Sequence, residues 1–436
     1  MTVLVETLVD PVAVKARELP RVAIVCDLYE EDWPSMELVA DMLLDHLQRD
    51  YADVFAPTRI RPPMRRRFTR QRAEVRGQRS EVRGQRSGVG EQRSEDGNHR
   101  STVSGQRSAF DDSRFNADRF LNRFWDYPRF VRGRRSEFDL FHVVDHSYGQ
   151  LLHELPPERT IITCHDLDTF QCLLNPVEEP RSIFFRKMTG RTLSGFRQAA
   201  RVTCDSVATR EELLAHKLVA PERAVVIPNG VHPSCSPEAD PVADEEVTRL
   251  LGKPDAGAPD ILHVGSTIPR KRIDVLLRIF AAVLLEFPGA RLTRVGGPFT
   301  PEQIKLVNEL GIAGAIVVLP HLERKLLAAV YRRAAVVLQP SSREGFGLPV
   351  VEAMACGTTV VASDLPVLRE VGGAAALYCP VGDISSWQET VIQLLNDRRQ
   401  ASRSWSERRD AGIAQASKFS WEEYTRKMVA VYQELL

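Results

Sequence analysis

The sequence predicts an α/β protein with two doubly wound domains that face each other across a cleft. Apolar, strand-like runs alternate with amphipathic helical segments in two separate series, a pattern typical of parallel sheets covered by helices. The stretch HPSCSPEADPVADEEV, rich in Pro, Asp and Glu, separates the two series and reads as a linker. At 436 residues the chain is long enough for two hydrophobic cores.

The first series predicts a Rossmann-like domain over residues 21–232. It begins with the strand RVAIV, a polar turn and a helix that Ser35 can cap. Further strands are expected at FDLFHVV, RTIITC, ARVTC and RAVVI, and a helix at ATREELLAHKL. We place the linker at 233–257.

The second series predicts a similar domain over residues 258–416. Its strands are expected at DILHV, ARLTRV, AIVVL, AVVLQ and TTVVAS, with helices at RIDVLLRIFAAVLLEF and ERKLLAAVYRRA. The amphipathic segment 417–436 is expected to be a helix that packs back on the first domain. Doubly wound sheets bind ligands beyond the carboxyl ends of their strands, so we expect the site in the cleft.

An arginine-rich repeat interrupts the first domain. Five seven-residue units, such as EVRGQRS, fill residues 74–108, and no unit has the apolar pair that a coiled-coil seam requires. Because Gly, Ser, Gln and Arg bury little surface, we predict a disordered insertion over about 70–110. It is either a tolerated surface insertion or a basic arm for an anionic membrane or nucleic acid.

Composition favours a soluble protein in a reducing compartment. The formal net charge is zero, and the seven cysteines form no Cys-x-x-Cys pair, which argues against a disulfide framework or a zinc site. The start of the chain does not resemble a signal peptide, and no apolar run is long enough to span a bilayer. We expect a cytoplasmic protein, with peripheral association at the inner face of the membrane as an open alternative.

Two glutamates flank a glycine-rich turn at the start of a short helix, in SSREGFGLPVVEAMACG. The helix N-terminus favours an anion such as diphosphate, and the glycines let backbone N–H groups approach a ligand. Glu352, one turn into the helix, can accept hydrogen bonds from a ribose diol, and Glu344 can reach sugar hydroxyls. Together they suit a nucleotide diphosphate sugar. Either glutamate alone is equally consistent with a helix-dipole partner or a solvated loop residue.

The basic turn PRKR and a histidine after a buried strand complete the candidates. Arg270 and Lys271 can stabilise the negative charge on a departing diphosphate, although a solvated basic turn is the better explanation of this motif taken alone. His165 ends a buried strand on the cleft side, where a structural role is the simpler explanation. We find no Asp-x-Asp element placed to hold a divalent ion, so we predict no metal and no cofactor.

These blocks, in this order, resemble the retaining glycosyltransferases of the large GT-B family 4. The resemblance rests on Glu344-x7-Glu352 and on ILHVGSTIPRKRIDVLLRIF, RLTRVGG, VTCDSVATREELL and VIPNGV, and it extends over most of the chain from Arg21. VGSTIPRK and TCHDL look most like the mannosyltransferase branch, which uses GDP-mannose in surface-polysaccharide assembly. The resemblance implies an acceptor-side first domain and a nucleotide-sugar-binding second domain.

Carried over to this sequence, the resemblance implies a role for each matched residue. Arg270 and Lys271 would hold the donor diphosphate, Glu352 the ribose, and Glu344 the hexose, with His165 beside the hexose near the reaction centre. The remaining donor-binding residues would be Gly265, Ser266, Gly345, Phe346, Gly347 and Leu348. Ser266 stands where many relatives have Arg, which puts more of the phosphate binding on Arg270 and Lys271. The turn after the first strand also lacks the glycines that many relatives carry.

The resulting prediction is a transferase that moves a hexose, mannose from GDP-mannose, onto a glycan or lipid-linked acceptor with retention. The alternatives are a UDP- or ADP-glucose-dependent glucosyltransferase, a non-catalytic nucleotide-sugar-binding or scaffold protein, and an arginine-driven binder of membrane or nucleic acid. The expected partners are the nucleotide-sugar donor and the acceptor, with no specific nucleic acid. The sequence does not give the linkage or the oligomeric state.

Overall fold

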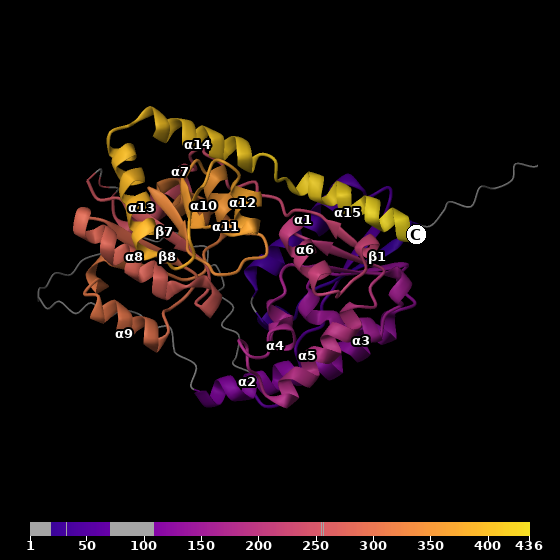
Figure 1. Cartoon of the computed structure of the whole chain (residues 1–436). Helices are drawn as coiled ribbons and strands as arrows, with labels where there is room; N and C mark the ends of the chain where they lie inside the picture. The colour runs from indigo at the N-terminus through magenta and orange to yellow at the C-terminus, as the bar shows by residue number, and fades with distance from the viewer. Residues whose placement is uncertain (1–18, 32, 70–108, 254, 256) are drawn as a thin grey trace, which may run out of the picture.

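The computed structural model describes residues 19–31, 33–69, 109–253, 255 and 257–436. The predicted disordered repeat at 74–108 therefore lies outside the described residues. The described chain forms two α/β lobes, and the C-terminal helix crosses from the second lobe back to the first (Figure 1).

The first lobe is built on six parallel strands in the order β2-β1-β3-β4-β5-β6. They are β1 (Arg21–Val25), β2 (Ala56–Ile60), β3 (Leu140–Val143), β4 (Thr160–Cys164), β5 (Arg201–Cys204) and β6 (Ala224–Val226). The helices are α1 (Pro34–Asp50), α2 (Ala109–Leu121), a π-helical turn (Asn122–Asp126), α3 (Tyr127–Arg134), the 3-10 helix η3 (His146–His153), α4 (Gln171–Leu174), α5 (Ile183–Phe196) and α6 (Val207–Ala215).

The second lobe is built on six further parallel strands in the order β12-β11-β10-β7-β8-β9. They are β7 (Asp260–Val264), β8 (Arg291–Val295), β9 (Ile316–Leu319), β10 (Val336–Gln339), β11 (Val360–Ser363) and β12 (Leu377–Cys379). The helices are α7 (Pro241–Leu251), α8 (Ile273–Glu286), α9 (Pro301–Glu309), α10 (Arg324–Arg333), α11 (Leu348–Ala355), α12 (Pro366–Gly372), α13 (Ile384–Arg399) and α14 (Arg403–Ala416). The two sheets confirm the predicted α/β architecture.

Each sheet is covered by helices on both faces, which explains why its strands are continuous apolar runs. In the first lobe, α1 packs on one face, and α3, η3 and α5 pack on the other. In the second lobe, α7, α10, α11 and α12 cover one face, and α8 and α13 cover the other. Helix α15 (Trp421–Leu435) shares a core with α1 and β1 of the first lobe.

The structure differs from the predicted linker at 233–257, because most of its second half is helix α7. Asp240 caps this helix by accepting a hydrogen bond from the backbone of Ala243, and Pro241 occupies the first turn. Ala243, Val247 and Leu251 form an apolar stripe that packs into the core of the second lobe. Of the linker signals, Asp240, Pro241 and the acidic residues after them are the start of a capped helix.

Two further observations bear on the predicted setting of the protein. All seven cysteines are buried and none forms a disulfide. Among the described helices, none combines the length and apolarity that crossing a membrane requires.

Candidate active site

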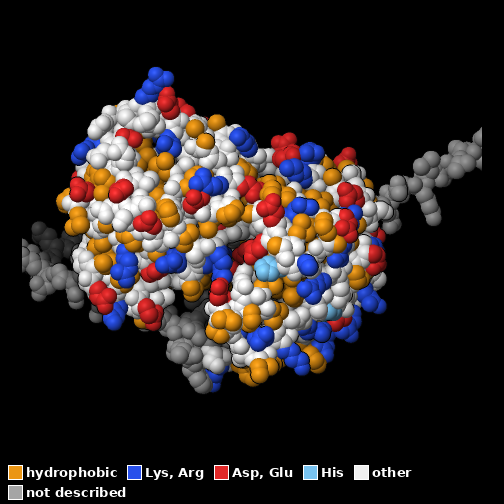
Figure 2. Space-filling model, in the orientation of Figure 1, with side chains coloured by type: hydrophobic (Ala, Val, Ile, Leu, Met, Phe, Trp, Pro, Cys, Tyr) orange, Lys and Arg blue, Asp and Glu red, His pale blue; other side chains and the backbone are white. Residues whose placement is uncertain are grey.

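A cleft of about 960 Å³ lies between the two lobes, beyond the carboxyl ends of strands from both sheets. Charged side chains of both signs gather along the groove between the lobes in Figure 2. The residues predicted from the sequence all line this cleft: His165, Gly265, Ser266, Arg270, Lys271, Glu344, Gly345, Phe346, Gly347, Leu348 and Glu352. Their functional roles stay predictions, but they are now one spatial group.

The Glu344 carboxylate lies between the two predicted cations. Its Oε1 accepts hydrogen bonds from Lys271 Nζ at 2.7 Å and Ser341 Oγ at 2.7 Å, and its Oε2 accepts one from Arg270 Nη1 at 3.1 Å. Burial alone would raise the pKa of this carboxyl, but Lys271 and Arg270 lower it to about 2. Glu344 is therefore an ionised carboxylate whose oxygens are both engaged.

The glycine-rich turn brings the two lobes into contact. A Cβ on Gly345 would lie 1.7 Å from the carbonyl oxygen of His165, so only glycine fits there. Gly347 precedes α11 with φ of 96°, a left-handed conformation that favours glycine. The Phe346 side chain packs into the core against Phe419, at 5.6 Å between ring centroids, so it serves as an anchor for this turn.

Arg270 joins the second lobe to acidic residues of the first. Its Nε lies 2.5 Å from Asp168 Oδ2, and its Nη2 donates to Asp166 Oδ2 at 3.3 Å. These two residues, with Leu167, form an Asp-x-Asp sequence that the sequence analysis did not single out. The expectation that no such element is placed to hold a divalent ion stays a prediction. Both carboxylates face arginines, since Arg343 Nε also lies 3.2 Å from Asp168. In the described part of the chain, no cluster of three His, Cys, Asp or Glu is arranged to hold a metal ion.

His165 is held by bonds at both ring nitrogens. Nδ1 lies 2.6 Å from Asp205 Oδ2, and Nε2 lies 2.7 Å from the carbonyl oxygen of Val144. Burial alone would lower the pKa of this ring, but the Asp205 carboxylate raises it to about 10. The ring is therefore an imidazolium donating both protons within the first lobe. The backbone carbonyl of His165, packed on Gly345, is the part of the residue that faces the second lobe.

Glu352 lies one turn inside α11 and is buried at the cleft wall. The Tyr331 hydroxyl donates to its Oε2 at 2.9 Å, and Arg324 Nη1 lies 3.9 Å from its Oε1. Burial raises the pKa of this carboxyl above its ordinary value. Its Oε1 has the weaker of these contacts and is therefore the oxygen more available to a ligand hydroxyl.

Two glycine turns at the ends of β7 and β8 form the floor of the cleft, and a buried arginine connects them. A Cβ on Gly296 would lie 2.1 Å from the Gly265 carbonyl oxygen, so the turns are in backbone contact. Arg294 donates from Nη2 to that same oxygen at 3.0 Å, and from Nη1 to the carbonyl of Gly297. This guanidinium is fully buried, and burial lowers its pKa to about 10. The sequence analysis did not single out Arg294; its position next to the end of a predicted strand, at the cleft side, is the signal that we missed.

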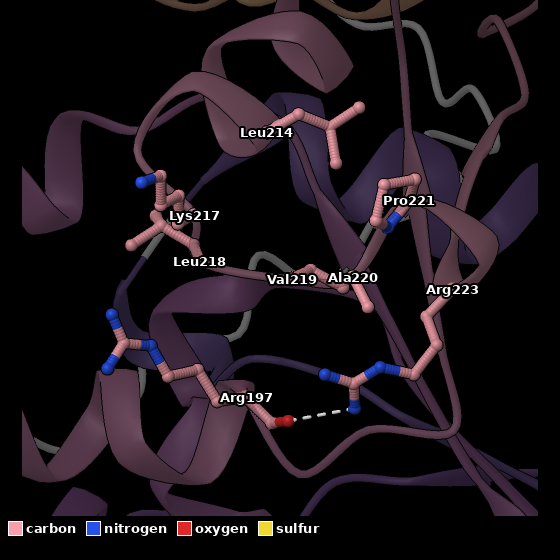
Figure 3. A pocket seen from close by; sticks show the side chains of 8 residues that line it. All are labelled: Arg197, Leu214, Lys217, Leu218, Val219, Ala220, Pro221 and Arg223. Atoms are coloured by element: carbon pink, nitrogen blue, oxygen red, sulfur yellow. Dashed lines mark hydrogen bonds between the residues drawn. The ribbon is translucent and has the colours of Figure 1, made fainter.

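A second pocket, of about 550 Å³, lies on the first lobe (Figure 3). It is lined by Arg197, which precedes β5, and by Arg223, which precedes β6. The pocket therefore lies at the amino ends of the strands, whereas the cleft lies beyond their carboxyl ends. Arg223 donates to the carbonyl oxygen of Arg197 at 2.9 Å. The lining contains no carboxylate, histidine, hydroxyl or thiol side chain, so we place the candidate active site in the cleft.

Two doubly wound lobes that face a charged cleft define the GT-B architecture. Solved structures agree: sucrose-phosphate synthase from Thermosynechococcus elongatus has a TM-score of 0.66 at 19% identity, over 95% of this chain and 99% of that one. A glycosyltransferase from Rickettsia africae has a TM-score of 0.61 at 14% identity, over 96% and 99%. These likenesses show the fold.

Sequence comparisons give the family. Residues 251–411 match the profile described as Glycosyl transferases group 1, and residues 90–234 match that of Glycosyltransferase Family 4. The chain therefore belongs to the group 1 glycosyltransferases of GT-B fold.

Two curated relatives are similar over different shares of their length. The O-antigen chain mannosyltransferase B of Escherichia coli is 29% identical over 70% of this chain and 79% of the relative. The D-inositol 3-phosphate glycosyltransferase of Mycolicibacterium smegmatis is 37% identical over 40% of each. The match to this second relative covers less than half of the length of either protein.

Proposed function

We propose that this chain transfers a hexose, mannose from GDP-mannose, onto a glycan or lipid-linked acceptor in polysaccharide biosynthesis. One observation carries the proposal: Arg270 and Lys271 meet around Glu344 beside the N-terminus of α11, with Glu352 one turn further in. The E. coli relative is named a mannosyltransferase, which favours mannose as the sugar.

The geometry suits a nucleotide diphosphate sugar bound along the second lobe. Its diphosphate would take hydrogen bonds from Arg270 and Lys271 and would lie at the positive end of α11. Oε1 of Glu352 would accept from the ribose, and Glu344, steered by the two cations, would accept from hexose hydroxyls. The glycine turns at Gly265 and Gly296, with Ser266, would lie beneath the phosphates.

We infer retention by front-face displacement. The bond from the anomeric carbon to the diphosphate oxygen breaks, and a bond to the acceptor oxygen forms on the same face. The acceptor proton passes to the departing diphosphate oxygen. Two features support this route: His165 is already an imidazolium and cannot accept a proton, and both oxygens of Glu344 are engaged, which disfavours it as a nucleophile. A trapped covalent glycosyl-enzyme would contradict the inference.

We propose that no metal or cofactor takes part. Charge-assisted hydrogen bonds from Arg270 and Lys271, worth about 1.5–3 kcal/mol each, would stabilise the leaving diphosphate. Activity should then be unchanged after dialysis against EDTA. Loss of turnover that Mg²⁺ or Mn²⁺ restores would overturn this part of the proposal.

The decisive experiment is a donor panel with purified full-length protein. GDP-mannose, UDP-glucose and ADP-glucose are each incubated with glycan and lipid acceptor extracts, and nucleotide release and product linkage are measured. The proposal predicts GDP release from GDP-mannose together with an α-linked product. Release of UDP or ADP from a glucose donor would favour a glucosyltransferase, and donor binding without turnover on any extract would indicate a non-catalytic binding protein.

A further inference from the structure

The first two turns of α5 project from the first lobe with apolar side chains in solvent. The exposed fractions are 85% for Ile183, 62% for Phe184 and 49% for Phe185. Ser182 caps the helix by accepting a hydrogen bond from the backbone of Phe185 at 3.2 Å. The cap therefore holds these turns in helical form without burying their side chains.

The other end of α5 is firmly anchored, so its exposed turns have a defined position. A Cβ on Gly195 would lie 2.1 Å from the carbonyl oxygen of Gly149 in η3, and Leu193 and Phe196 are in the core of the first lobe. The exposed turns are thus an extension of a rigid element, in contrast to a mobile loop that happens to carry aromatic residues.

The exposed aromatic residues continue into the cleft. The Phe184 ring lies 5.5 Å from that of Phe120, which lies 5.3 Å from that of Phe124. Together with Phe185 and Met188, these rings line the first-lobe side of the cleft. We call the five residues the aromatic mouth: Phe120, Phe124, Phe184, Phe185 and Met188. Hydrophobic side chains gather at the lower edge of Figure 2, where Figure 1 places α2 and α5.

The segment around this helix is basic, with Arg186, Lys187 and Arg191 on α5 itself. Residues 180–200 hold five cations and no Asp or Glu: Arg181, Arg186, Lys187, Arg191 and Arg197. The Arg181 guanidinium lies 5.5 Å from the centre of the Phe185 ring, so charge and aromatic surface are mixed. Aromatic rings among basic residues on a projecting helix match the interface of an anionic bilayer, where rings enter the headgroup layer and cations meet lipid phosphates.

We propose that the aromatic mouth seats this protein on an anionic phospholipid surface and that its acceptor is carried there on a lipid. The inference rests on the proposed function, because it assigns the acceptor side of the same cleft. The inference depends on the continuity of the aromatic mouth with the cleft. A lipid-linked sugar at the membrane surface can enter the cleft between α2 and α5 while its apolar chain stays among the phenylalanines. Of the two acceptor classes in the proposed function, a glycan and a lipid-linked sugar, the inference selects the lipid-linked sugar.

Vesicle flotation of full-length protein tests the proposal. The probes are phosphatidylcholine vesicles and vesicles of phosphatidylcholine with phosphatidylglycerol. Wild type should float with the anionic vesicles and much less with the neutral ones. Phe184→Ser with Phe185→Ser should lower partitioning by about tenfold or more, and Arg186→Ser with Lys187→Ser should remove most of the preference for phosphatidylglycerol.

A matched control uses exposed apolar residues of the other lobe. Val242, on α7, and Leu285, on α8, are 81% and 79% exposed. Val242→Ser with Leu285→Ser should leave flotation unchanged. The proposal is overturned if wild type ignores both vesicles, or if the phenylalanine variant floats like wild type. It is also overturned if that variant changes the oligomeric state while flotation stays constant, since a second copy would then cover the mouth.

Donor binding in the same samples separates this inference from the proposed function. Titration with GDP-mannose should give equal affinity for wild type and the phenylalanine variant. Intact donor binding with no flotation refutes the lipid surface alone. Flotation with no binding of any nucleotide sugar refutes the proposed function and leaves a lipid-binding protein.

Discussion

Replacing Glu344 with Gln should destabilise the free protein by about 3 kcal/mol and separate binding from turnover. The ordinary pKa of this carboxyl is 4.5, and its value of about 2 in the folded protein corresponds to about 3 kcal/mol of stabilisation of the ionised form. Because the group is fully buried among Lys271, Arg270 and Ser341, solvent screening takes little from this figure.

The pH dependence has a definite sign. A depressed pKa means that the stabilisation is complete above about pH 4.5 and is lost as the pH falls from there towards 2. Urea unfolding at pH 7 should therefore show the full difference between wild type and Glu344→Gln, and unfolding at pH 3.5 should show a smaller one. The exposed Glu389 of α13 supplies the control, because Glu389→Gln should change stability little at either pH.

The same variant tests the ligand assignment. Without the carboxylate, Arg270 and Lys271 lose one acceptor that competes with phosphate, so the affinity for GDP should hold or rise. Turnover should fall by about 10²-fold, since the hexose loses an acceptor. A stability difference below about 0.5 kcal/mol at pH 7, or a loss of GDP binding equal to the loss of turnover, would refute this account of Glu344.

Three other substitutions address neighbouring groups. Glu352→Ala should weaken GDP binding as well as turnover, and unchanged GDP affinity by calorimetry would refute the ribose assignment. Lys271→Ala should lower turnover by about 10²–10³-fold; an intact rate would mean that the phosphate site lies elsewhere. Arg294→Gln should reduce affinity for GDP by about tenfold but affinity for guanosine little, whereas Arg278→Gln, on the exposed face of α8, should change neither. Equal losses for GDP and guanosine would make Arg294 a purely structural residue.

Much of the fold was predictable because its strands are buried on both faces. Strands β1, β3, β4, β7 and β10 are mainly apolar runs, so each could be predicted from its own sequence without knowing which strand it pairs with. The edge strands β2 and β12 were missed: APTRI contains a proline and an arginine, and LYC has three residues. Edge strands are paired on one side only, so their sequences are less constrained.

The predicted site residues were brought together, but their pairings were not predictable. Glu344 and Glu352 are eight residues apart on one turn and helix, so their common location follows from local geometry. Arg270 and Asp168, by contrast, come from different domains and meet only through the packing of the two lobes. His165 and Asp205 lie in one lobe and follow adjacent strands of one sheet, so their contact depends on the order of the strands. Sequence patterns fix which strand end a residue occupies, while the order of strands decides its neighbour.

The charges in the cleft indicate how an anionic donor can bind to a site whose positive and negative side chains already balance one another. Arg270, Lys271 and Arg343 face Asp166, Asp168 and Glu344, so a diphosphate would add negative charge to a balanced group. Binding must then exchange the first-lobe carboxylates on Arg270 for phosphate oxygens, which loosens a contact between the lobes. A further positive charge lies behind the glycine turns on Arg294, whose guanidinium donates to backbone carbonyls and whose pKa is lowered by burial. A diphosphate over those turns would supply the counter-charge that this buried cation lacks, which is why we expect Arg294→Gln to discriminate between GDP and guanosine.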